Sequence, residues 1–573
     1  LSIINIKRMK RNYITLSLLL GVALSMTARE RTVAEMKQAA LGVIGKSVVG
    51  KKSAPLNAEA LQVLDQKSQL TVLGTQGGGF AVIANDDNFS PVLGYSENSG
   101  NGEVAPGFLW WMNEMNASLE QALANGETNE PVKLDASYKK EVPQLLTTIW
   151  GQGKPNNNLT PVYPGENGDE HYVVGCVATA MSQIMRYHKY PIHGKGSRSY
   201  RFAPGGGVAA VTLSANFGEA TYDWDNMIDD YSGSYTDAQA QAVALISFHC
   251  GVSVKMTYTK DGSGSYSSDA VGALRKYFTY NPNIKYFNRD YFPRKEWMNL
   301  VYRELSDGCP ILYGGQSTSG GHAFVLDGYN EKGLVRVNWG WNGSQNGYFD
   351  IGSLNGFSSQ QTIVQMRLPN DTRFTQTYTS NRGLAASIEA SYSSSSDLVS
   401  VTGNTAYQLD VDPFTGSICL MALNTETGRV MNIGKVVSGI SKKKFGSGIN
   451  IGTAQFSASS LPKGKYRIFF ASIVEGESTY QPVRAKETVR NSYILTVGDK
   501  VTLKADNDAN WTGVESVAIA DDTRTSADNT VRVYDTTGRL VYYAPQSLYN
   551  ENDIPVKGVL IVKQGTQTKK IFK

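Results

Sequence analysis

The chain has 573 residues, of which 41% are hydrophobic and 18% are charged, a composition typical of soluble globular protein with room for about three to five domains. Its 55 Lys and Arg residues nearly balance its 51 Asp and Glu residues, and there is no basic stripe, so the charge gives no support to nucleic acid as a partner. Four cysteines are too few for a disulfide scaffold. Neither they nor the five histidines have the spacing of a metal site, so we expect no metal and no cofactor.

The first recognisable feature is a targeting segment. A basic start at Met9 is followed by the apolar run Ile14–Leu24 and then by small residues up to Ala28. This pattern is typical of a secretory signal peptide over residues 9–28, and it is too short for a comfortable membrane span. No later run approaches the length of a transmembrane helix. We therefore expect no membrane span and an exported product, secreted or at the cell surface.

Residues 29–140 read as a separate small α+β domain without a nucleophile and base of its own. The patterns predict helices over Thr32–Ile44 and from Trp110 to about Ala124, and strands over Leu70–Leu73 and Phe80–Ala84. The polar segment Asn125–Glu141, which contains Lys139 and Lys140, is typical of an exposed, cleavable linker.

Residues 141–370 alternate helical and strand patterns and form the predicted central domain. Beyond Asn370 the composition shifts to Ser, Thr and Gly with short alternating strands such as Tyr466–Phe470. We expect a β-sandwich over residues 371–503 and a small all-β domain over residues 510–573.

Cys176 opens the most informative stretch, which is bounded by Gly175 and Pro191. Side chains at 177, 181, 184, 185 and 188 recur at three- and four-residue steps, which predicts a helix from Cys176 to about Tyr190. The thiol then lies at a helix N-terminus, where the unpaired N–H groups and the helix dipole favour a thiolate. The alternative is a small buried cysteine without chemistry.

Three further patterns in the central domain favour the catalytic interpretation of Cys176 over the structural one. Gln152 lies in the Gly- and Pro-containing loop 150–156, where its amide suits an oxyanion on an attacked carbonyl. His322 heads the apolar strand 320–329 behind two glycines, and Asn338 and Trp339 end the strand that starts at residue 335.

Cys, then His, then Asn is the chain order of the papain-like arrangement. An imidazole from His322 beside the Cys176 thiol yields a thiolate–imidazolium pair, and the Asn338 amide can orient the ring. Each residue also has an alternative without a catalytic role. His322 could be a structural histidine in the core, and Asn338 could cap a turn. We interpret Trp341 as packing and His188, on the apolar helix face, as structural.

The motifs GCVATAMSQIMRYHKYP (175–191), GGHAFVLDG (320–328) and VNWGWNG (337–343) closely resemble the streptopain family of secreted cysteine peptidases, which also includes the interpains. The resemblance implies a papain-like α+β catalytic domain. By position it implies that Cys176 is the nucleophile and His322 the base. It assigns Asn338 and Trp339 as the pair that orients the histidine and Gln152 as the oxyanion residue.

The segment 29–140 resembles the inhibitory pro-domain of that family, especially at Phe80–Asp87 and Pro91–Ser96. The resemblance implies a zymogen whose own pro-domain is an intramolecular inhibitor until proteolysis removes it. The closing residues resemble the C-terminal sorting domain of the type IX secretion system, which implies the secretion machinery as a partner. Streptopain lacks the extension 370–573, so the family says nothing of its role.

The resulting hypothesis is an exported cysteine endopeptidase that takes protein or peptide substrates. Two alternatives stay open: a surface adhesin with a vestigial peptidase domain, and a transpeptidase or amidase that uses the same acyl-enzyme. The family resemblance implies a preference for a hydrophobic residue two places before the scissile bond, but no pattern identifies the pocket. A Cys250–Cys309 disulfide is possible on sequence grounds alone.

Overall fold

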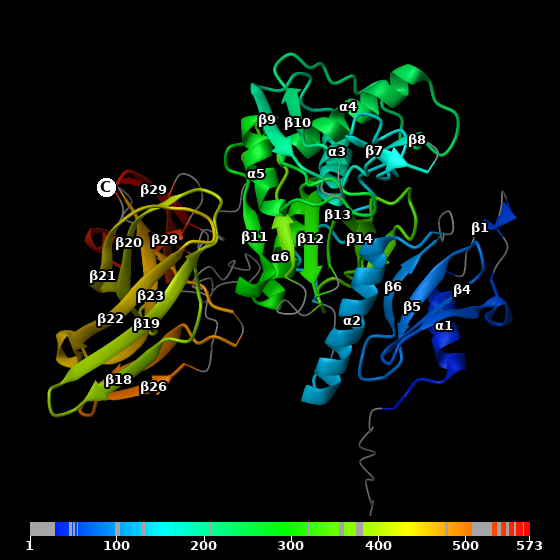
Figure 1. Cartoon of the computed structure of the whole chain (residues 1–573). Coiled ribbons are helices and arrows are strands. Elements are labelled where there is room, and N and C mark those ends of the chain that lie inside the picture. The colour runs from blue at the N-terminus through cyan, green and yellow to red at the C-terminus, as the bar shows by residue number, and fades with distance from the viewer. Residues whose placement is uncertain are drawn as a thin grey trace, which may run out of the picture.

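The computed structural model is a mixed α/β chain in which few helices accompany many strands (Figure 1). The predicted signal peptide, residues 9–28, lies outside the described residues. The structure describes residues 29–44, 48–49, 52–53, 56–97, 103–128, 132–166, 168–204, 208–318, 320–354, 360–373, 382–475, 480–486, 488–506, 530–535, 540–545, 549–554, 557–564 and 567–573.

The N-terminal segment packs two helices on opposite faces of a small antiparallel sheet. Along β5, Phe80 and Val82 face the core beneath α2, while Ala81 and Ile83 face α1, because side chains alternate along a strand. The elements are α1 (Val33–Ile44), β1 (Val48–Val49), β2 (Lys52–Ser53), η1 (Ala58–Ala60), β3 (Gln62–Gln66), β4 (Leu70–Gly74), β5 (Phe80–Ala84), β6 (Val92–Ser96) and α2 (Pro106–Asn125).

Helix α2 differs from its prediction at the start. The apolar pattern predicts a helix from Trp110, whereas α2 begins earlier, at Pro106. Proline is favoured at the first helical position because its missing N–H has no intrahelical partner there. The helix ends at Gly126, whose left-handed φ of 68° allows its N–H to cap the last turn.

The central segment, called here the peptidase segment after the family that its motifs resemble, has four α-helices in its described residues and carries the larger part of one sheet. Its elements are β7 (Val162–Gly165), β8 (Gly168–His171), α3 (Cys176–His188), β9 (Ser197–Phe202), β10 (Val211–Asn216), α4 (Asp237–Ser253), α5 (Ser267–Lys276), β11 (Tyr286–Asn288), η2 (Arg289–Tyr291), α6 (Arg294–Ser306), β12 (Ile311–Ser317), β13 (Gly320–Tyr329), β14 (Val335–Asn338), β15 (Gly347–Phe349) and β16 (Thr362–Val364).

A single ten-stranded sheet joins the N-terminal and peptidase segments, in the order β11-β16-β12-β13-β14-β15-β6-β5-β4-β3. The junction is the antiparallel pair β15–β6, where Tyr348 is opposite Tyr95 and Phe349 is opposite Gly94. A Cβ at Gly94 would overlap the Phe349 ring, so the glycine allows this close approach. The N-terminal segment is therefore built into the sheet of the peptidase segment through β6.

Two cores lie on opposite faces of that sheet. Along β13, Ala323 and Val325 belong to the core shared with α3, α4 and α5, whereas Phe324 and Leu326 belong to the core shared with α2 and α6. Helix α3 contacts β12 and β13, and α2 and α6 also contact β13. Strand β13 is thus packed between helices of two layers, one of which contains α2 of the N-terminal segment.

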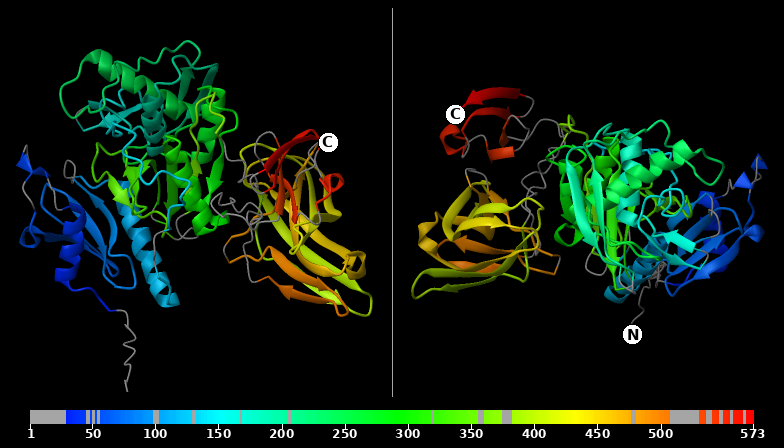
Figure 2. Two further views of the ribbon diagram at one scale, coloured as in Figure 1. Left: turned by 180° about the vertical axis from the view of Figure 1, so that it is seen from behind. Right: turned by 45° about the horizontal axis from the view of Figure 1, so that its top comes forward.

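Two further sheets, called here the two-sheet unit, share a core that includes Val401, Leu420 and Phe470. Their elements are β17 (Arg382–Leu384), β18 (Glu389–Ser393), β19 (Leu398–Gln408), β20 (Phe414–Asn424), β21 (Val430–Lys443), β22 (Gly448–Ser457), η4 (Ala458–Ser460), β23 (Gly464–Val474), β24 (Tyr480–Pro482), β25 (Ser492–Val497) and β26 (Thr502–Ala505). The unit lies on the side of the peptidase segment opposite the N-terminal segment (Figures 1 and 2).

The last elements form a four-stranded antiparallel sheet in the order β28-β27-β29-β30. They are β27 (Thr530–Asp535), β28 (Leu540–Pro545), η7 (Glu551–Asp553), β29 (Val559–Gln564) and β30 (Gln567–Phe572). The predicted domain boundaries, 29–140, 141–370, 371–503 and 510–573, stay predictions.

Among the described residues no helix is long and apolar enough to cross a membrane, and no cluster of His, Cys, Asp and Glu could hold a metal ion. Cys176, Cys250, Cys309 and Cys419 are all free, so the possible Cys250–Cys309 disulfide is not formed.

Candidate active site

Cys176 is the first residue of α3, as the apolar periodicity predicts. Gly175 precedes it with a left-handed φ of 93°, and a Cβ at this glycine would lie 2.7 Å from the Met256 sulfur. No other residue fits there without displacing its surroundings. The helix ends at His188, slightly before the predicted Tyr190, because Lys189 adopts a left-handed cap with φ of 47°.

The thiol of Cys176 is partly buried, and this burial raises its pKa above the ordinary value. The backbone N–H groups of Ala323, Val177 and Cys176 itself favour the thiolate, but desolvation is the larger effect. In this state of the chain the sulfur is therefore held as a neutral thiol. Its contact with Ala323 places it against β13, one residue from His322.

Gln152 lies beside the nucleophile in the loop before α3. Its side-chain oxygen accepts the N–H of Gly175 at 3.1 Å, and its backbone oxygen accepts the N–H of Val174 at 3.0 Å. Because the oxygen is held by the turn, the amide NH2 is the end that can donate to a substrate. This geometry suits the predicted oxyanion role, which stays a prediction.

His322 lies on the other face of the sheet from α3. It is directly opposite Gly315 of β12, and a Cβ at Gly315 would overlap the ring of Trp110 from α2. Residues paired across an antiparallel ladder project to the same face, and Phe324, two residues along β13, also contacts Trp110 with ring centroids 5.9 Å apart. His322 is thus on the α2 face, whereas Cys176 meets β13 from the α3 face.

Burial lowers the pKa of His322 below its ordinary value, and nothing else shifts it. Among the described residues no hydrogen bond joins the Cys176 thiol to the His322 ring, and neither group appears among the causes of the other's pKa shift. Both groups are therefore neutral near pH 7 in this state. The predicted nucleophile, Cys176, and the predicted base, His322, both contribute to the region around β13 but are not assembled as an ion pair.

Asn338 ends β14, Trp339 follows it, and the two side chains project to opposite faces. The Asn338 side chain is fully buried, and its NH2 donates to the Thr148 backbone oxygen at 2.8 Å and to the Gln183 side-chain oxygen at 3.1 Å. Its own oxygen accepts the N–H of Gly340 at 3.0 Å. These partners occupy the amide that is predicted to orient His322, so that role stays a prediction for a rearranged state.

The Trp339 indole packs on the α2 face, 4.8 Å from the Phe324 ring and 6.1 Å from the Phe108 ring. Its N–H donates to the Gln345 backbone oxygen at 2.9 Å. A Cβ at Gly107 of α2 would lie 2.9 Å from the same indole. Trp339 therefore contacts the N-terminal segment directly, on the face of the sheet where His322 lies.

Residues 150–349 match the model of the peptidase C10 family. Streptopain from Streptococcus pyogenes is 33% identical over an alignment of 367 residues, and the match covers 58% of this chain and 91% of streptopain. This chain belongs to the peptidase C10 family. It is a cysteine peptidase.

Two other relatives of this C10 peptidase extend the comparison. Thiol protease/hemagglutinin PrtT from Porphyromonas gingivalis is 31% identical over an alignment of 388 residues, and the match covers 62% of this chain and 44% of PrtT. A solved fragment of prointerpain A from Prevotella intermedia is 41% identical with a TM-score of 0.50, and the match covers 54% of this chain and 99% of the fragment.

Gln183 is a buried residue of the C10 peptidase that sequence reasoning does not single out. Its side-chain oxygen accepts hydrogen bonds from Thr148 Oγ1 at 3.0 Å, the Trp150 N–H at 3.2 Å and Asn338 Nδ2 at 3.1 Å. The only available signal is a polar residue among the apolar positions of α3. It ties the nucleophile helix to β14 and to the loop that carries Gln152.

The remaining histidines of the C10 peptidase include two structural ones. His188 Nδ1 lies 3.0 Å from the Tyr280 hydroxyl, and His249 Nδ1 lies 2.9 Å from the Tyr222 hydroxyl. Burial lowers the pKa of each to about 4. This agrees with the structural interpretation of His188.

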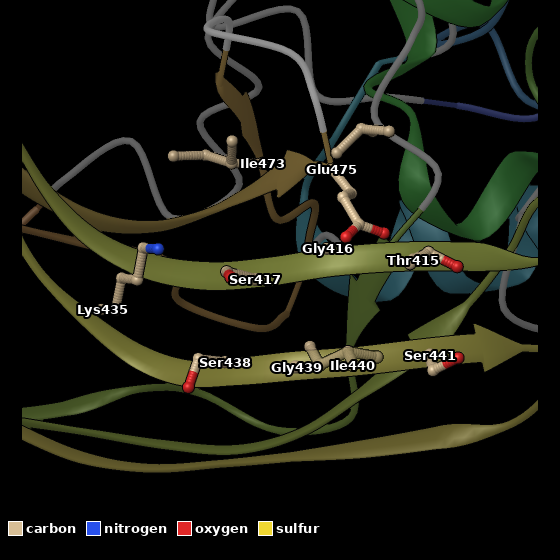
Figure 3. Close-up of a pocket in the computed structure, with 11 residues that line it drawn as sticks. Thr415, Gly416, Ser417, Lys435, Ser438, Gly439, Ile440, Ser441, Ile473 and Glu475 are labelled. Atoms are coloured by element: carbon tan, nitrogen blue, oxygen red, sulfur yellow. The ribbon is translucent and has the colours of Figure 1, made fainter.

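A separate pocket of about 510 Å³ lies in the two-sheet unit, between the edges of β20, β21 and β23 (Figure 3). Hydroxyl groups of Thr415, Ser417, Ser438 and Ser441 line it together with Lys435 and Glu475. It contains none of the predicted catalytic residues, so no chemistry of the C10 peptidase is assigned to it.

Proposed function

We propose that the chain is a secreted cysteine endopeptidase made as a zymogen. The observation that carries this proposal is the position of His322 on the α2 face while Cys176 approaches β13 from the α3 face. An N-terminal segment that shares the sheet and packs Trp110 beside the histidine strand is suited to hold the pair apart. Its removal then lets His322 turn toward the thiol.

The assembled site acts by nucleophilic catalysis. His322 takes the thiol proton, and the Cys176 thiolate attacks the peptide carbonyl to form a C–S bond. The oxyanion that develops accepts hydrogen bonds from the Gln152 amide and the Cys176 N–H. The imidazolium then protonates the leaving amine as the C–N bond breaks, which leaves an acyl-enzyme. A water molecule, deprotonated by His322, releases the acid and the free thiol.

Supporting residues complete the proposed mechanism. Asn338 accepts a hydrogen bond from the His322 ring in the matured enzyme, and Trp339 shields this contact from water once α2 has left it. The substrates are proteins or peptides, in keeping with the family. The N-terminal segment 29–140 is the intramolecular inhibitor, and the similarity to the solved prointerpain A fragment supports this assignment. Cleavage falls in the polar linker near Lys139 and Lys140.

The proposed route to the outside is the signal peptide 9–28, with the C-terminal sheet of residues 510–573 as a sorting domain for secretion machinery. The alternative, a surface adhesin with a vestigial peptidase domain, stays a prediction, and the pocket lined by Lys435 and Glu475 lies in the two-sheet unit. This pocket shares no residue with the candidate active site.

The test is maturation of the purified precursor 29–573 in a reducing agent, followed by mass and by casein cleavage. The wild type and a Cys419→Ala control, which changes a buried cysteine of the two-sheet unit, are expected to trim themselves near residue 140 and gain activity. Cys176→Ala is expected to do neither. Thiol-dependent cleavage that persists in Cys176→Ala would exclude Cys176 as the nucleophile. An added amine captured in the products would favour the transpeptidase instead.

A further inference from the structure

The two-sheet unit meets the peptidase segment through a buried ion pair. Arg484, which follows β24, binds both carboxylate oxygens of Glu296 on α6 at 2.7 and 3.1 Å, with side chains 1% and 9% exposed. The guanidinium also donates to the Tyr291 backbone oxygen at 3.0 Å and lies 4.1 Å from the centre of the Phe292 ring. Separating such a pair is costly because each charge is already desolvated.

A second set of ion pairs in the same interface has the opposite polarity. Lys285 of the peptidase segment binds Asp410 at 2.9 Å and Asp412 at 3.2 Å, and Arg275 binds Asp412 at 2.6 Å. The peptidase segment thus contributes an anion at Glu296 and cations at Lys285 and Arg275. Complementary charges of both signs fix one orientation, because a rotated docking would place like charges together.

Close packing fills the space between these pairs. A Cβ at Gly383 of β17 would overlap the Tyr291 ring, so the two backbones approach as closely as the residue types allow. Leu409 of the two-sheet unit packs against the core beneath α6, and Val411 packs against the core on the other face of the sheet. The interface therefore combines apolar contact with the ion pairs.

The position of this interface separates it from the N-terminal segment. The two-sheet unit contacts the peptidase segment beside β11, at one end of the ten-stranded sheet, whereas the N-terminal segment enters the sheet beyond β15 (Figure 2). Cleavage near residue 140 therefore removes none of these contacts. The match to the C10 family model ends at residue 349, before the two-sheet unit begins.

We infer that the two-sheet unit is a permanently docked component of the matured peptidase, held by the Arg484–Glu296 and Lys285–Asp410 contacts and not only by the connecting residues 374–381. The mature enzyme then consists of the peptidase segment and the two-sheet unit in one fixed orientation. The surface of the peptidase segment beside β11 thus binds the two-sheet unit of the same chain.

The direct test cuts the connection. A site for a sequence-specific protease is placed between Arg373 and Arg382 of the full precursor, and the protein is cut there. The products are analysed by size-exclusion chromatography at micromolar concentration in 0.15 M salt, where the Debye length is about 8 Å. We expect the two pieces to elute together before and after removal of the N-terminal segment. Elution as two separate pieces would overturn the inference.

Variants of the cut protein show which contacts hold the pieces. Arg484→Glu places two carboxylates together and is expected to weaken association by about 30-fold or more, and Glu296→Arg in the same chain is expected to recover part of it. The control Lys463→Glu changes an exposed pair with Asp499 inside the two-sheet unit and should leave association unchanged.

Arg484 is buried, so its variant is checked for folding by circular dichroism. Asp412→Lys provides the second measurement, because the Asp412 side chain is 51% exposed and Lys285 keeps its pair with Asp410. It is expected to weaken association by several-fold at low salt and to lose less association than the wild type when salt is added, because salt screens the new repulsion from Lys285 and Arg275. Equal association of wild type, Arg484→Glu and Asp412→Lys would show that the ion pairs do not hold the interface.

Discussion

The side-chain oxygen of Gln183 accepts a hydrogen bond from the Asn338 amide at 3.1 Å, inside the core between α3 and β14. The same oxygen accepts the Trp150 N–H, two residues before Gln152. One buried amide thus joins the helix of the nucleophile, the strand of the predicted orienting residue and the loop of the predicted oxyanion donor.

Replacing Gln183 tests this link. Gln183→Leu leaves the donors of Thr148, Trp150 and Asn338 without their common acceptor, and an unpaired buried donor costs about 1–3 kcal/mol. We expect the free energy of unfolding to fall by about 2–4 kcal/mol. We also expect kcat of the matured enzyme to fall more than KM rises, because the loop that carries Gln152 is displaced. If Gln183→Leu folds and its kcat and KM are unchanged, Gln183 does not position the residues of the candidate active site.

The matched control is Gln241→Leu, which changes an exposed glutamine of α4. Thermal unfolding and steady-state kinetics of the two variants are measured side by side. Surface substitutions of this kind usually change stability by no more than about 0.5 kcal/mol, so only Gln183→Leu should depart from the wild type.

Gly315→Ala tests whether Trp110 holds the N-terminal segment on the histidine strand. The new Cβ overlaps the Trp110 ring, so α2 must shift, at a cost of about 1–3 kcal/mol for overpacking. We expect the precursor to mature faster than the wild type in the same reducing buffer, measured as loss of the full-length mass with time. Gly272→Ala is the control, since nothing lies within 4 Å of its added Cβ. Equal maturation rates for the two variants would show that the contact of Trp110 with the histidine strand does not contribute to inhibition.

The buried His249 predicts a loss of stability in acid. Burial lowers the pKa of His249 from 6.5 to about 4. Between about pH 4 and pH 6.5 the unfolded chain therefore binds a proton at His249 that the folded chain does not bind. Stability from this group is complete above pH 6.5 and falls as the pH drops toward 4, by at most about 3 kcal/mol.

His249→Gln, which keeps a polar partner for the Tyr222 hydroxyl, is expected to flatten that part of the pH profile of the unfolding midpoint. His193→Gln changes an exposed histidine and should leave the profile as in the wild type. An acid slope that is the same in both variants would mean that His249 is not the titrating group.

The elements that carry the site can be predicted from local sequence. The apolar steps along residues 177–188 predict α3, and with it Cys176 at a helix start. The apolar run after Gly321 predicts β13, and the Gly- and Pro-containing loop predicts a fixed Gln152, whose side chain indeed holds the turn at Gly175. These patterns are short-range: each is produced by the residues of a single buried face, so it can be recognised without knowing the rest of the fold.

Features that depend on partners far along the chain could not be predicted in this way. The face on which His322 lies depends on its register with Gly315 and on Trp110 from the N-terminal segment. Gln183 reads in sequence as a polar helix position, yet it is fully buried because Asn338 and Thr148 arrive from other segments. The interface charges carry no pattern at all, since each pair joins residues more than a hundred positions apart.

The most direct measurement of the central claim is the pH profile of Cys176 alkylation by iodoacetamide, before and after removal of residues 29–140. The other three cysteines are buried, and the mass of the Cys176 peptide identifies the product. In the precursor we expect a midpoint above the ordinary thiol pKa of about 8.5, because burial raises the pKa of Cys176 and His322 is on the other face.

In the matured enzyme the midpoint is expected well below pH 7, because a thiolate paired with an imidazolium ionises at low pH. His322→Ala should return it toward the precursor value, while the exposed-site control His193→Ala should not. The shape of the profile reports the pKa independently of how fast the reagent reaches the thiol. The same midpoint in precursor and matured wild type would contradict a zymogen in which the N-terminal segment keeps Cys176 and His322 apart.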